Sequence, residues 1–257
     1  MLIILPPSES KRPAPDAGPP VELRELSFPE LNPMRERILD ALIQTSGQPD
    51  AFTRLRVGPS LVEDVMRNTV LRETPTQPAF DVYVGPLYGG LDPATLTPAS
   101  RARSRKAVVI ASSLWGALRP FDRIPSYRLD VCSRLIGCDR LEPVWRTVLP
   151  TVLADAAGPR GVVLDLRSPG YQAIGVPAIE SGRRVTIRVL PEAGARSVGN
   201  VIAKRIRGQI ARHLLDVGSD PSTPDDLADV LSDRWPTRLD PPEGPTQPWT
   251  LRLRPPD

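Results

Sequence analysis

Histidine and cysteine are nearly absent from this chain. Its 257 residues include one histidine, His213, and two cysteines, Cys132 and Cys138. The two cysteines are spaced unlike a zinc knuckle, so a site of histidine and cysteine ligands is close to excluded. A site built from carboxylates is not excluded on this ground. We therefore expect no tightly held transition metal, and the sequence indicates no cofactor.

Long apolar runs are missing as well. No run approaches the roughly 18 apolar residues of a membrane span. The opening LIIL is shorter than the roughly 7 to 15 apolar residues of a secretory signal. Hydrophobic residues still make up 40% of the chain, which suffices for a sizeable core. These features predict a cytoplasmic protein with no membrane partner, and we expect a monomer.

Proline, in contrast, is abundant, with 32 residues, many of them in segments 6–33 and 221–256. Proline lacks the amide that helices and central strands require, so both segments are typical of extended loops or partly disordered ends. We therefore predict a core domain over residues 1–216. A proline-rich C-terminal extension over residues 217–257 is packed on that core or partly flexible.

Apolar patterns predict an alternation of strands and helices. The expected strands cover residues 2–5, 81–85, 107–111, 162–166 and 185–190. The expected helices cover residues 33–44, two short pieces of 50–69, then 143–157, 197–216 and a short one from Pro224. Interleaved helices and strands predict an α/β or α+β class, with a mixed sheet flanked by helices.

Residues 50–69 contain two short helical patterns joined by Val57, Gly58 and Pro59. Ser60 and Glu63 have the spacing of a capping box for the second helix. The pattern is that of a helix-hairpin-helix motif, in which backbone amides at the turn contact a DNA phosphate without reading sequence. The alternative is an ordinary helical hairpin packed on the core, and the pattern alone favours that alternative.

Three apolar strands run into unusually polar turns. LIIL leads into Ser8, Glu9 and Lys11, AVVIA into Ser112 and Ser113, and VVLDL into Arg167, Ser168 and Tyr171. In open sheets with helical crossovers, ligands bind beyond the carboxyl ends of the strands, so the three turns are expected to line one crevice. A fourth segment, DVYVGPLYGGLD, with its expected strand over residues 81–85, adds Tyr83, Gly85, Tyr88 and Gly89.

The segment from Ser181 to Arg212 is rich in arginine and favours an anionic partner, or else a solvated face of ordinary charges. Its predicted helix has an apolar stripe formed by Val198, Ile202, Ile206, Ile210 and Leu214. The opposite side carries Lys204, Arg207, Gly208 and Ala211, where small residues beside cations would admit a phosphate. His213 lies close to the apolar stripe, so we interpret it as a core histidine rather than a catalytic one.

Six motifs together resemble one known family. SSLWGALRPFDRIPSYRLDV resembles the signature of the peroxide stress protein YaaA family, also called DUF328 or UPF0246. The other five are LIILPPSESK, DVYVGPLYGGL, PVWRTVLPTVL, VVLDLRSPGYQAI and KRIRGQIARHLL, and they follow in the family's order from Met1 to about Leu215.

The resemblance implies a mixed α/β fold peculiar to the family, with a helix-hairpin-helix element at about residues 50–70 and a basic cleft. It also implies a role in peroxide resistance, a lowering of available intracellular iron, and binding of double-stranded DNA without sequence preference.

Two functional classes stay open at this point. The first is a DNA-binding stress protein whose expected phosphate contacts are Gly58, Ser60, Lys204, Arg207 and Arg212. The second is an enzyme acting on an anionic nucleotide-like or phosphorylated small molecule. Its expected catalytic residues are Asp122, Tyr127, Lys11, Ser112 and Tyr171, and its expected ligand-binding residues are Ser8, Ser113, Arg119, Arg128, Ser168, Lys204 and Arg207.

In the enzyme hypothesis, Asp122 or Glu9 is the general base and Tyr127 or Tyr171 the acid, while the arginines hold the anion. A serine hydrolase is disfavoured because the Gly-x-Ser-x-Gly motif is absent. We expect one wall of the crevice to comprise Arg119, Asp122, Tyr127 and Arg128. The rival account is mutual ion pairing of these arginines with carboxylates such as Asp122, Glu142 and Asp165, because such groups are costly to bury unpaired.

Overall fold

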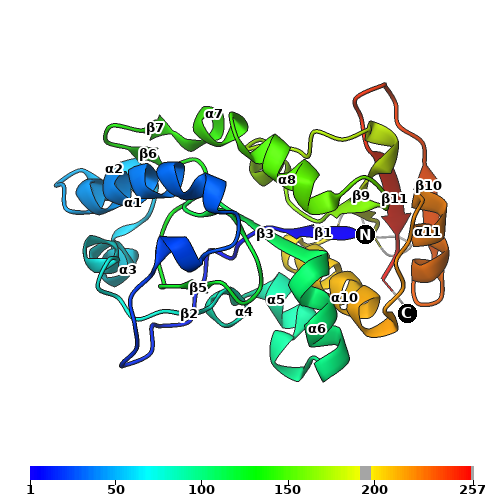
Figure 1. Ribbon diagram of the computed structural model, residues 1–257, viewed down its shortest axis with the longest axis horizontal. Helices are drawn as coiled ribbons and strands as arrows, with labels where there is room; N and C mark the ends of the chain where they lie inside the picture. Colours follow the sequence, from blue (N-terminus) through cyan, green and yellow to red (C-terminus); the bar gives the residue numbers. More distant parts are fainter. Residues whose placement is uncertain (192–197, 256–257) are drawn as a thin grey trace.

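A computed structural model describes residues 1–191 and 198–255. Its main sheet has seven strands in the order β10-β11-β9-β8-β1-β3-β4, and helices flank it (Figure 1). The strands are β1 Leu2–Leu5, β3 Val108–Ser112, β4 Gly116–Leu118, β8 Val163–Asp165, β9 Arg184–Val189, β10 Thr237–Asp240 and β11 Trp249–Leu253. The predicted class, a mixed sheet flanked by helices, is confirmed.

Strand β1 lies at the centre of the sheet. Its four side chains are all buried, as expected for an apolar run without alternation. It pairs in parallel with β3 on one side and β8 on the other, with Ile3 opposite both Val108 and Leu164. The carboxyl ends of these three strands therefore meet at one edge of the sheet.

The helices cover both faces of this sheet (Figure 1). On one side lie α5 Pro86–Leu91, α6 Pro98–Ala107 and α10 Asn200–Val217, and on the other α7 Leu141–Arg146 and α8 Leu149–Ala157. The remaining helices are α1 Asn32–Ser46, α2 Ala51–Leu55, α3 Val62–Arg67, α4 Ala79–Val82, α9 Pro169–Gln172 and α11 Pro224–Ser232. Short 3-10 helices cover Leu23–Glu25, Pro29–Leu31, Pro59–Leu61, Asn68–Val70, Pro93–Thr95 and Ser181–Arg183.

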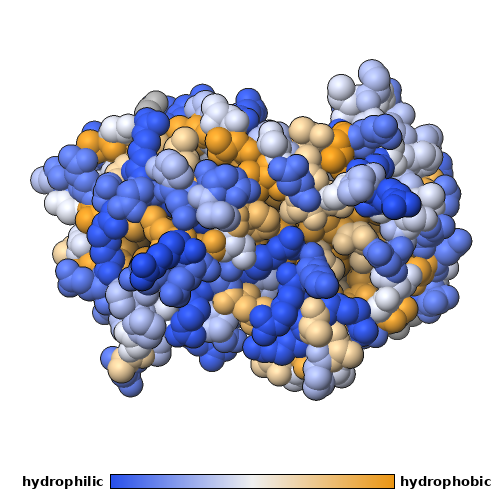
Figure 2. All heavy atoms as spheres, in the orientation of Figure 1, coloured by the Kyte–Doolittle hydropathy of each residue, from blue (hydrophilic) through white to orange (hydrophobic). Residues whose placement is uncertain are grey.

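Two small ribbons complete the fold. Strand β2 (Gln77–Pro78) pairs with β5 (Arg123–Ile124), and β6 (Arg134–Leu135) pairs with β7 (Asp139–Arg140), both antiparallel. On the face drawn in Figure 2, hydrophilic side chains cover most of the surface. Hydrophobic side chains come into view mainly toward its middle.

Helices α5 and α10 touch backbone to backbone through two glycines. A β-carbon at Gly90 would lie 2.1 Å from the Arg205 carbonyl oxygen, and one at Gly208 would lie 1.9 Å from that of Leu87. The missing side chains allow α10 to lie directly against α5. Gly208 and Ala211 are therefore buried against protein, and Gly208 does not form the phosphate-admitting surface expected from the sequence.

Several predicted elements differ from the structure. Residues 81–85 were expected as a strand, but α4 occupies Ala79–Val82 and only Tyr83 makes a β-bridge, to Lys11. The expected helix over 143–157 is divided into α7 and α8. Pro150 accounts for the division, because a proline ring inside a helix clashes with the carbonyl four residues earlier, here that of Arg146.

The proline-rich C-terminal segment contributes to the main sheet. Strand β11 pairs in parallel with β9 and antiparallel with β10, so residues after 236 extend the sheet at its edge. Sequence patterns missed both strands, because prolines surround them and charged side chains interrupt the apolar residues of WTLRL. The division into domains at residue 216 stays a prediction.

The expected basic helix begins later than predicted. Helix α10 starts at Asn200, and the expected start at Ser197 lies outside the described residues, as does Arg196. Ile202 is 54% exposed, so the buried stripe begins only at Ile206. His213 packs edge-on against Trp235, and its Nε2 lies 3.3 Å from the Val230 carbonyl oxygen, consistent with a structural histidine.

The turn between α2 and α3 differs in detail from the predicted motif. The N-cap of α3 is Leu61, and Ser60 lies inside the 3-10 helix Pro59–Leu61 without the expected capping-box bonds. Gly58 has φ −82° and ψ 163°, extended angles that any residue adopts. The left-handed residue of this turn is Arg56, with φ 56°. Glycine's conformational freedom is therefore not needed at position 58.

Candidate functional site

A cavity of about 240 Å³ opens at the carboxyl ends of β1 and β8, where α5 and α10 approach the sheet. Its walls combine the loop after β1, the first turn of α5, the loop after β8 and one face of α10. Five residues predicted as ligand-binding or catalytic line this cavity together: Ser8, Ser168, Tyr171, Lys204 and Arg207. Tyr88, Glu9 and Ser10 line it as well.

The loop after β1 is held by the segment around α4. The amide of Arg12 donates to the Val82 carbonyl at 2.8 Å, and the amide of Val84 donates to the Ser10 carbonyl at 3.2 Å. The Ser8 hydroxyl donates to the Val84 carbonyl. These bonds fix the loop that carries Ser8, Glu9 and Lys11, so this wall of the cavity is preformed.

Gly85 permits the close approach of this wall. Its φ is +115°, and a β-carbon there would lie 2.8 Å from the Ser8 hydroxyl oxygen. Glycine is the residue that adopts such angles without steric cost. Three positions further on, the Tyr88 hydroxyl donates to the Pro6 carbonyl at 2.9 Å, which ties α5 to the loop after β1.

The protein's four tyrosines gather at this edge of the sheet. The rings of Tyr83 and Tyr88 lie 5.4 Å apart, and the hydroxyl oxygens of Tyr83 and Tyr127 lie 2.9 Å apart. Tyr171 completes the group from the loop after β8. Burial is the main cause that raises the pKa of Tyr83, Tyr88, Tyr127 and Tyr171 above the usual value. All four hydroxyls are therefore protonated near neutral pH and act as hydrogen-bond donors.

Ser112 and Ser113 lie behind the cavity rather than in its lining. The Ser112 hydroxyl lies 2.8 Å from that of Tyr127 and accepts backbone N–H bonds from Leu114 and Trp115. The Ser113 hydroxyl donates to the Leu129 carbonyl at 3.0 Å. Both serines are fully buried and satisfied, so in this conformation they support the tyrosines and the turn after β3.

Lys11, which was predicted to be catalytic, lies on the loop after β1 but is not among the residues that line the cavity. Its Nζ donates to the carbonyls of Ser8 at 2.8 Å and Glu9 at 3.4 Å, and it lies 4.2 Å from the centre of the Tyr127 ring. Burial, followed by repulsion from Arg128, lowers the pKa of Lys11 from 10.5 to about 7. The amine is therefore partly unprotonated near neutral pH.

Arg128 lies beside the loop after β1. Its Nη1 donates to the Glu9 carbonyl at 3.2 Å, and its Nη2 lies 3.5 Å from the Glu9 carboxylate. The Asn68 side chain exchanges two 2.8 Å hydrogen bonds with the Arg128 backbone and so holds it in place. The arginine therefore orients Glu9, which lines the cavity.

A buried ion pair positions the loop after β8. Arg167 donates to both carboxylate oxygens of Asp165, at 2.9 and 2.6 Å, and is almost entirely buried. Its Nη1 also donates to the carbonyls of Tyr171 at 3.1 Å and Gly175 at 2.9 Å. The guanidinium thus fixes the backbone that carries Ser168 and Tyr171 into the cavity.

Lys204 and Arg207 supply the positive charge of the cavity. Within residues 1–191 and 198–255, neither side chain has an ion-pair or hydrogen-bond partner, and the buried Arg207 Nε is left without an acceptor. Burial lowers the pKa of Arg207, although Asp165 opposes the shift. Two unpaired cations in a partly enclosed hollow favour an anionic ligand.

Arg119 and Asp122 lie at the opposite edge of the sheet. Strand β4 runs antiparallel to β3 and returns the chain to the amino end of β3, where Arg119 Nη1 donates to the carbonyls of Lys106 at 2.7 Å and Val108 at 3.0 Å. Asp122 accepts bonds from the amide and hydroxyl of Ser27 and from the Arg119 amide. Arg119 and Asp122 therefore do not form the expected common wall with Tyr127 and Arg128. The hairpin of β3 and β4 places them at the amino end of β3.

The other expected phosphate contacts lie apart from the cavity. Gly58 and Ser60 are exposed on the turn between α2 and α3. Arg212 is already engaged, with bonds to Asp216 at 2.6 Å and to the Asp92 carbonyl and Thr95 hydroxyl at 3.1 and 2.8 Å. Its guanidinium is therefore occupied by protein groups.

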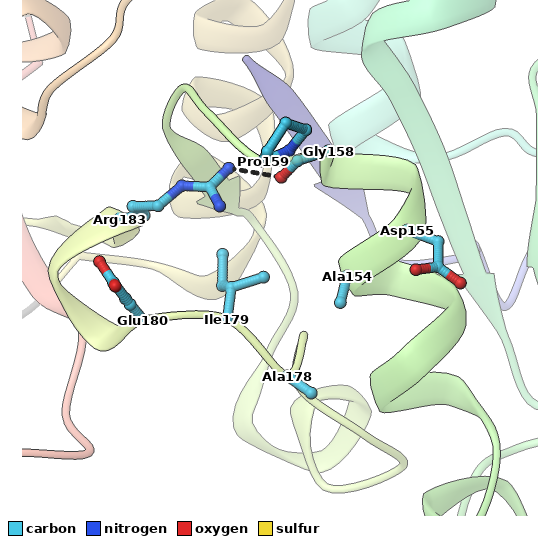
Figure 3. Close-up of a pocket in the computed structure, with 8 residues that line it drawn as sticks. All are labelled: Ala154, Asp155, Gly158, Pro159, Ala178, Ile179, Glu180 and Arg183. Atoms are coloured by element: carbon cyan, nitrogen blue, oxygen red, sulfur yellow. Dashed lines mark hydrogen bonds between the residues drawn. The ribbon is translucent and has the colours of Figure 1, made fainter.

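A larger hollow of about 610 Å³ lies at the end of α8 (Figure 3). Its one arginine, Arg183, donates to the Gly158 carbonyl at 2.9 Å. The Asp155 carboxylate points away from Ile179 and Arg183. This hollow is open and shallow, and its charged groups do not converge on a common point, so it is a weaker candidate than the smaller cavity.

Tyr88 lines the cavity, although the sequence prediction named it without assigning it a role. The clue was present in PLYGGL, where Gly90 permits the contact with α10 that encloses the site.

Among the residues that the structure describes, no group of three or more histidine, cysteine, aspartate or glutamate side chains is arranged to hold a metal. In the same described ranges, no helix has the length and apolar character needed to cross a membrane.

Comparison with known proteins gives matches along nearly the whole chain. The sequence model of the family described as "Peroxide stress protein YaaA" matches residues 1–237. A UPF0246 protein of Streptomyces coelicolor is 38% identical over 255 residues, covering 98% of this chain and 97% of the relative. A UPF0246 protein of Corynebacterium efficiens is 39% identical over 234 residues, covering 90% and 91%. A UPF0246 protein of Corynebacterium glutamicum is 33% identical over 234 residues, with the same coverage.

Proposed function

Because this chain belongs to the peroxide stress protein YaaA family, we propose that it acts in the cytoplasm in the response to peroxide stress. We propose further that its cavity binds an anionic, nucleotide-like or phosphorylated small molecule. The observation that carries this proposal is a pair of cations, Lys204 and Arg207, that have no partner among the described residues and lie in the wall of a partly enclosed cavity. Arg207 is partly buried, and leaving its Nε without a partner costs stability, which a bound anion offsets; Lys204 is exposed and adds a second positive charge.

The rest of the cavity suits such a ligand. Ser168 offers a hydroxyl group, and Tyr88 and Tyr171 offer aromatic faces. The volume of about 240 Å³ lies just below the range of roughly 300 to 1,000 Å³ typical of small-molecule sites, which favours a ligand no larger than a mononucleotide. In an enzymatic role, Tyr171 is the proton donor, because it lines the cavity and its hydroxyl is protonated.

Calorimetric titration with adenosine monophosphate tests this proposal. We expect saturable binding that Arg207→Ala weakens by about tenfold or more, since a charge-assisted hydrogen bond contributes roughly 1.5 to 3 kcal/mol. Arg205→Ala is the matched control, because Arg205 lies on the same helix but is exposed outside the cavity. Equal affinities of the Arg207→Ala and Arg205→Ala variants for adenosine monophosphate, at unchanged melting temperature, would contradict the cavity as the anion site.

A second candidate function is binding of duplex DNA without sequence preference, through which the protein limits oxidative damage. The exposed turn between α2 and α3, with Arg56, Gly58 and Ser60 at the surface, supports it. Short helices joined by such a turn present backbone amides and a cation to phosphates. In this function the monomer contacts DNA through the turn, and Arg212 takes no part because protein groups already occupy it.

Gel retardation of unrelated duplexes tests the DNA proposal. We expect similar affinities for all sequences and a steep loss of affinity with salt, because counterion release dominates non-specific binding. Ser60→Glu, which places a negative charge at the turn, should weaken retardation. Ser232→Glu, at the exposed end of α11, should not. Salt-insensitive binding, or equal effects of the two variants, would count against the turn as the DNA contact.

A further inference from the structure

A hollow lined by three arginines lies apart from the cavity. Arg56 comes from the end of α2, and Arg134 and Arg140 come from the two strands of the β6–β7 hairpin. The volume of this arginine hollow is about 320 Å³, within the range of roughly 300 to 1,000 Å³ typical of small-molecule sites. Although Gly170 of α9 lines the hollow and its neighbour Tyr171 lines the cavity, the two sites share no lining residue.

The two hairpin arginines lie directly opposite each other. The register of β6 and β7 pairs Arg134 with Arg140, so their β-carbons lie roughly 4.5 to 5.5 Å apart on one face of the ribbon. Like charges in this arrangement destabilise a pair of strands. The Glu142 carboxylate lies 3.5 Å from Arg140, but it also pairs with Arg146 at 2.5 Å. Among the described residues, protein groups therefore compensate the repulsion within the hairpin only in part.

The positive charges of the hollow act on a common point. In the part of the chain that the structure describes, neither Arg56 nor Arg134 has a hydrogen-bond or ion-pair partner for its side chain. The exposed thiol of Cys132 also lines the hollow. Burial and the Asp130 carboxylate raise the pKa of this thiol, whereas the guanidinium groups of Arg56 and Arg140 lower it. Arginines from two separate elements therefore direct their charge to the same side chain in the hollow.

Hydrogen bonds fix the backbone that carries these arginines. The Ser133 hydroxyl donates to the Leu55 carbonyl at 3.2 Å, and Arg56 follows Leu55 in the chain. The amide of Ile136 donates to the Thr45 hydroxyl at 2.9 Å, which ties the hairpin to α1. The hairpin is therefore held against α1 and α2 before any ligand arrives. Binding does not have to order this backbone, so little affinity is lost to conformational entropy.

We propose that Arg56, Arg134 and Arg140 form a second anion site, which binds the diphosphate group of a small molecule. A guanidinium presents a planar fork of N–H donors that matches phosphate oxygens, and it stays protonated in proteins. The cross-strand pair holds one phosphoryl group between its two forks, and Arg56, from a different element, binds the other. The bound negative charge relieves the repulsion within the hairpin. This site goes beyond the proposed function and does not depend on the cavity.

Alkylation of Cys132 by iodoacetamide measures occupancy of the arginine hollow. The full-length protein is treated with this neutral reagent at increasing concentrations of inorganic pyrophosphate, and labelling of Cys132 is followed by peptide mass spectrometry. We expect pyrophosphate to slow the alkylation in a saturable way. The concentration that halves the rate should rise about tenfold in Arg134→Ala, because a charge-assisted hydrogen bond is lost. It should stay unchanged in Arg160→Ala, the matched control at an exposed position outside the hollow.

Each rate is compared with that of the same variant without pyrophosphate, so a change in the pKa of the thiol does not affect the comparison. Inorganic phosphate should protect Cys132 about tenfold more weakly than pyrophosphate, since it reaches fewer of the arginines. Alkylation that pyrophosphate does not slow, or an equal halving concentration in Arg134→Ala and Arg160→Ala, would overturn the inference. Equal protection by phosphate would also overturn it. Protection by duplex DNA but not by pyrophosphate would do the same and would assign these arginines to a DNA contact.

Discussion

Gly208 of α10 lies directly against the backbone carbonyl of Leu87 in α5, so closely that a β-carbon at position 208 would stand 1.9 Å from that oxygen. Leu87 lines the cavity, and Arg207 precedes the glycine in the chain. The distance between the two backbones therefore sets how far the cations of α10 reach into the site. The contact connects helix packing with ligand binding.

We expect Gly208→Ala to destabilise the protein and to weaken anion binding. The new methyl group has no space unless α10 moves, and overpacking of this kind costs about 1 to 3 kcal/mol. Gly89→Ala is the matched control in α5, because a β-carbon there has no neighbour within 4 Å. The control should be neutral or stabilising by up to about 1 kcal/mol, as alanine is the better helix former. Urea denaturation measures both effects, and equal free energies of unfolding for the two variants would contradict the packing argument.

Arg167→Met should be strongly destabilising. It leaves the buried carboxylate of Asp165 without its cation and frees the carbonyls of Tyr171 and Gly175. Removing one partner of a buried pair costs about 3 to 5 kcal/mol. Arg72→Met, which breaks exposed pairs with two carboxylates of α1, should cost less than about 1 kcal/mol. Thermal or chemical unfolding distinguishes the two, and similar losses would show that the Asp165 pair is not a structural support of the loop.

Gly58→Val should leave the fold intact, whereas Gly116→Val should not. Position 58 has extended backbone angles, and its nearest neighbour to a β-carbon, the Ser60 hydroxyl, is 3.9 Å away. Gly116 has φ +71°, and a β-carbon there would lie 2.5 Å from the Trp145 ring. A comparison of soluble yield and melting temperature tests the contrast. Equal melting temperatures would mean that the tight turn after β3 is not required.

The stability of the protein should depend on pH through Lys11. Its folded pKa of about 7 lies below the value of 10.5 for an exposed lysine, so between these pH values the unfolded chain binds a proton that the folded protein does not. The free energy of unfolding therefore increases with pH from about pH 7 upward. Below pH 7 the buried amine is charged, and the full cost of burying that charge lowers the stability. Relative to Lys11→Met, the unsubstituted protein should become more stable between pH 7 and pH 9.5. The difference in free energy of unfolding between the unsubstituted protein and Lys106→Met should not change with pH. If the difference from Lys11→Met does not change with pH either, the assigned burial of Lys11 is contradicted.

The part of the site that could be predicted from sequence follows from the geometry of parallel strands. Ser8 and Ser168 come directly after apolar strands, and the carboxyl ends of parallel neighbours meet at one edge, so their proximity needs only the strand pattern. Lys204 and Arg207 could be assigned to one face of a helix by periodicity. Their approach to the sheet depends on the glycine contact, which sequence periodicity does not reveal.

The remaining differences have a common cause, since they depend on contacts between distant segments. Arg119 was expected beside Tyr127, but the antiparallel return of β4 places it at the amino end of β3. A strand pattern does not show whether the chain continues or reverses after it. Strand β11 was missed because its stability derives from pairing with β9 and β10 rather than from its own apolar pattern.

A crystal structure of the protein with adenosine monophosphate tests the central claim most directly. The account predicts the phosphate between Lys204 and Arg207, within hydrogen-bonding distance of both side chains, and the nucleoside toward Tyr88 and Tyr171. A cavity that stays empty at saturating nucleotide, or a phosphate bound instead at the turn between α2 and α3, would contradict it.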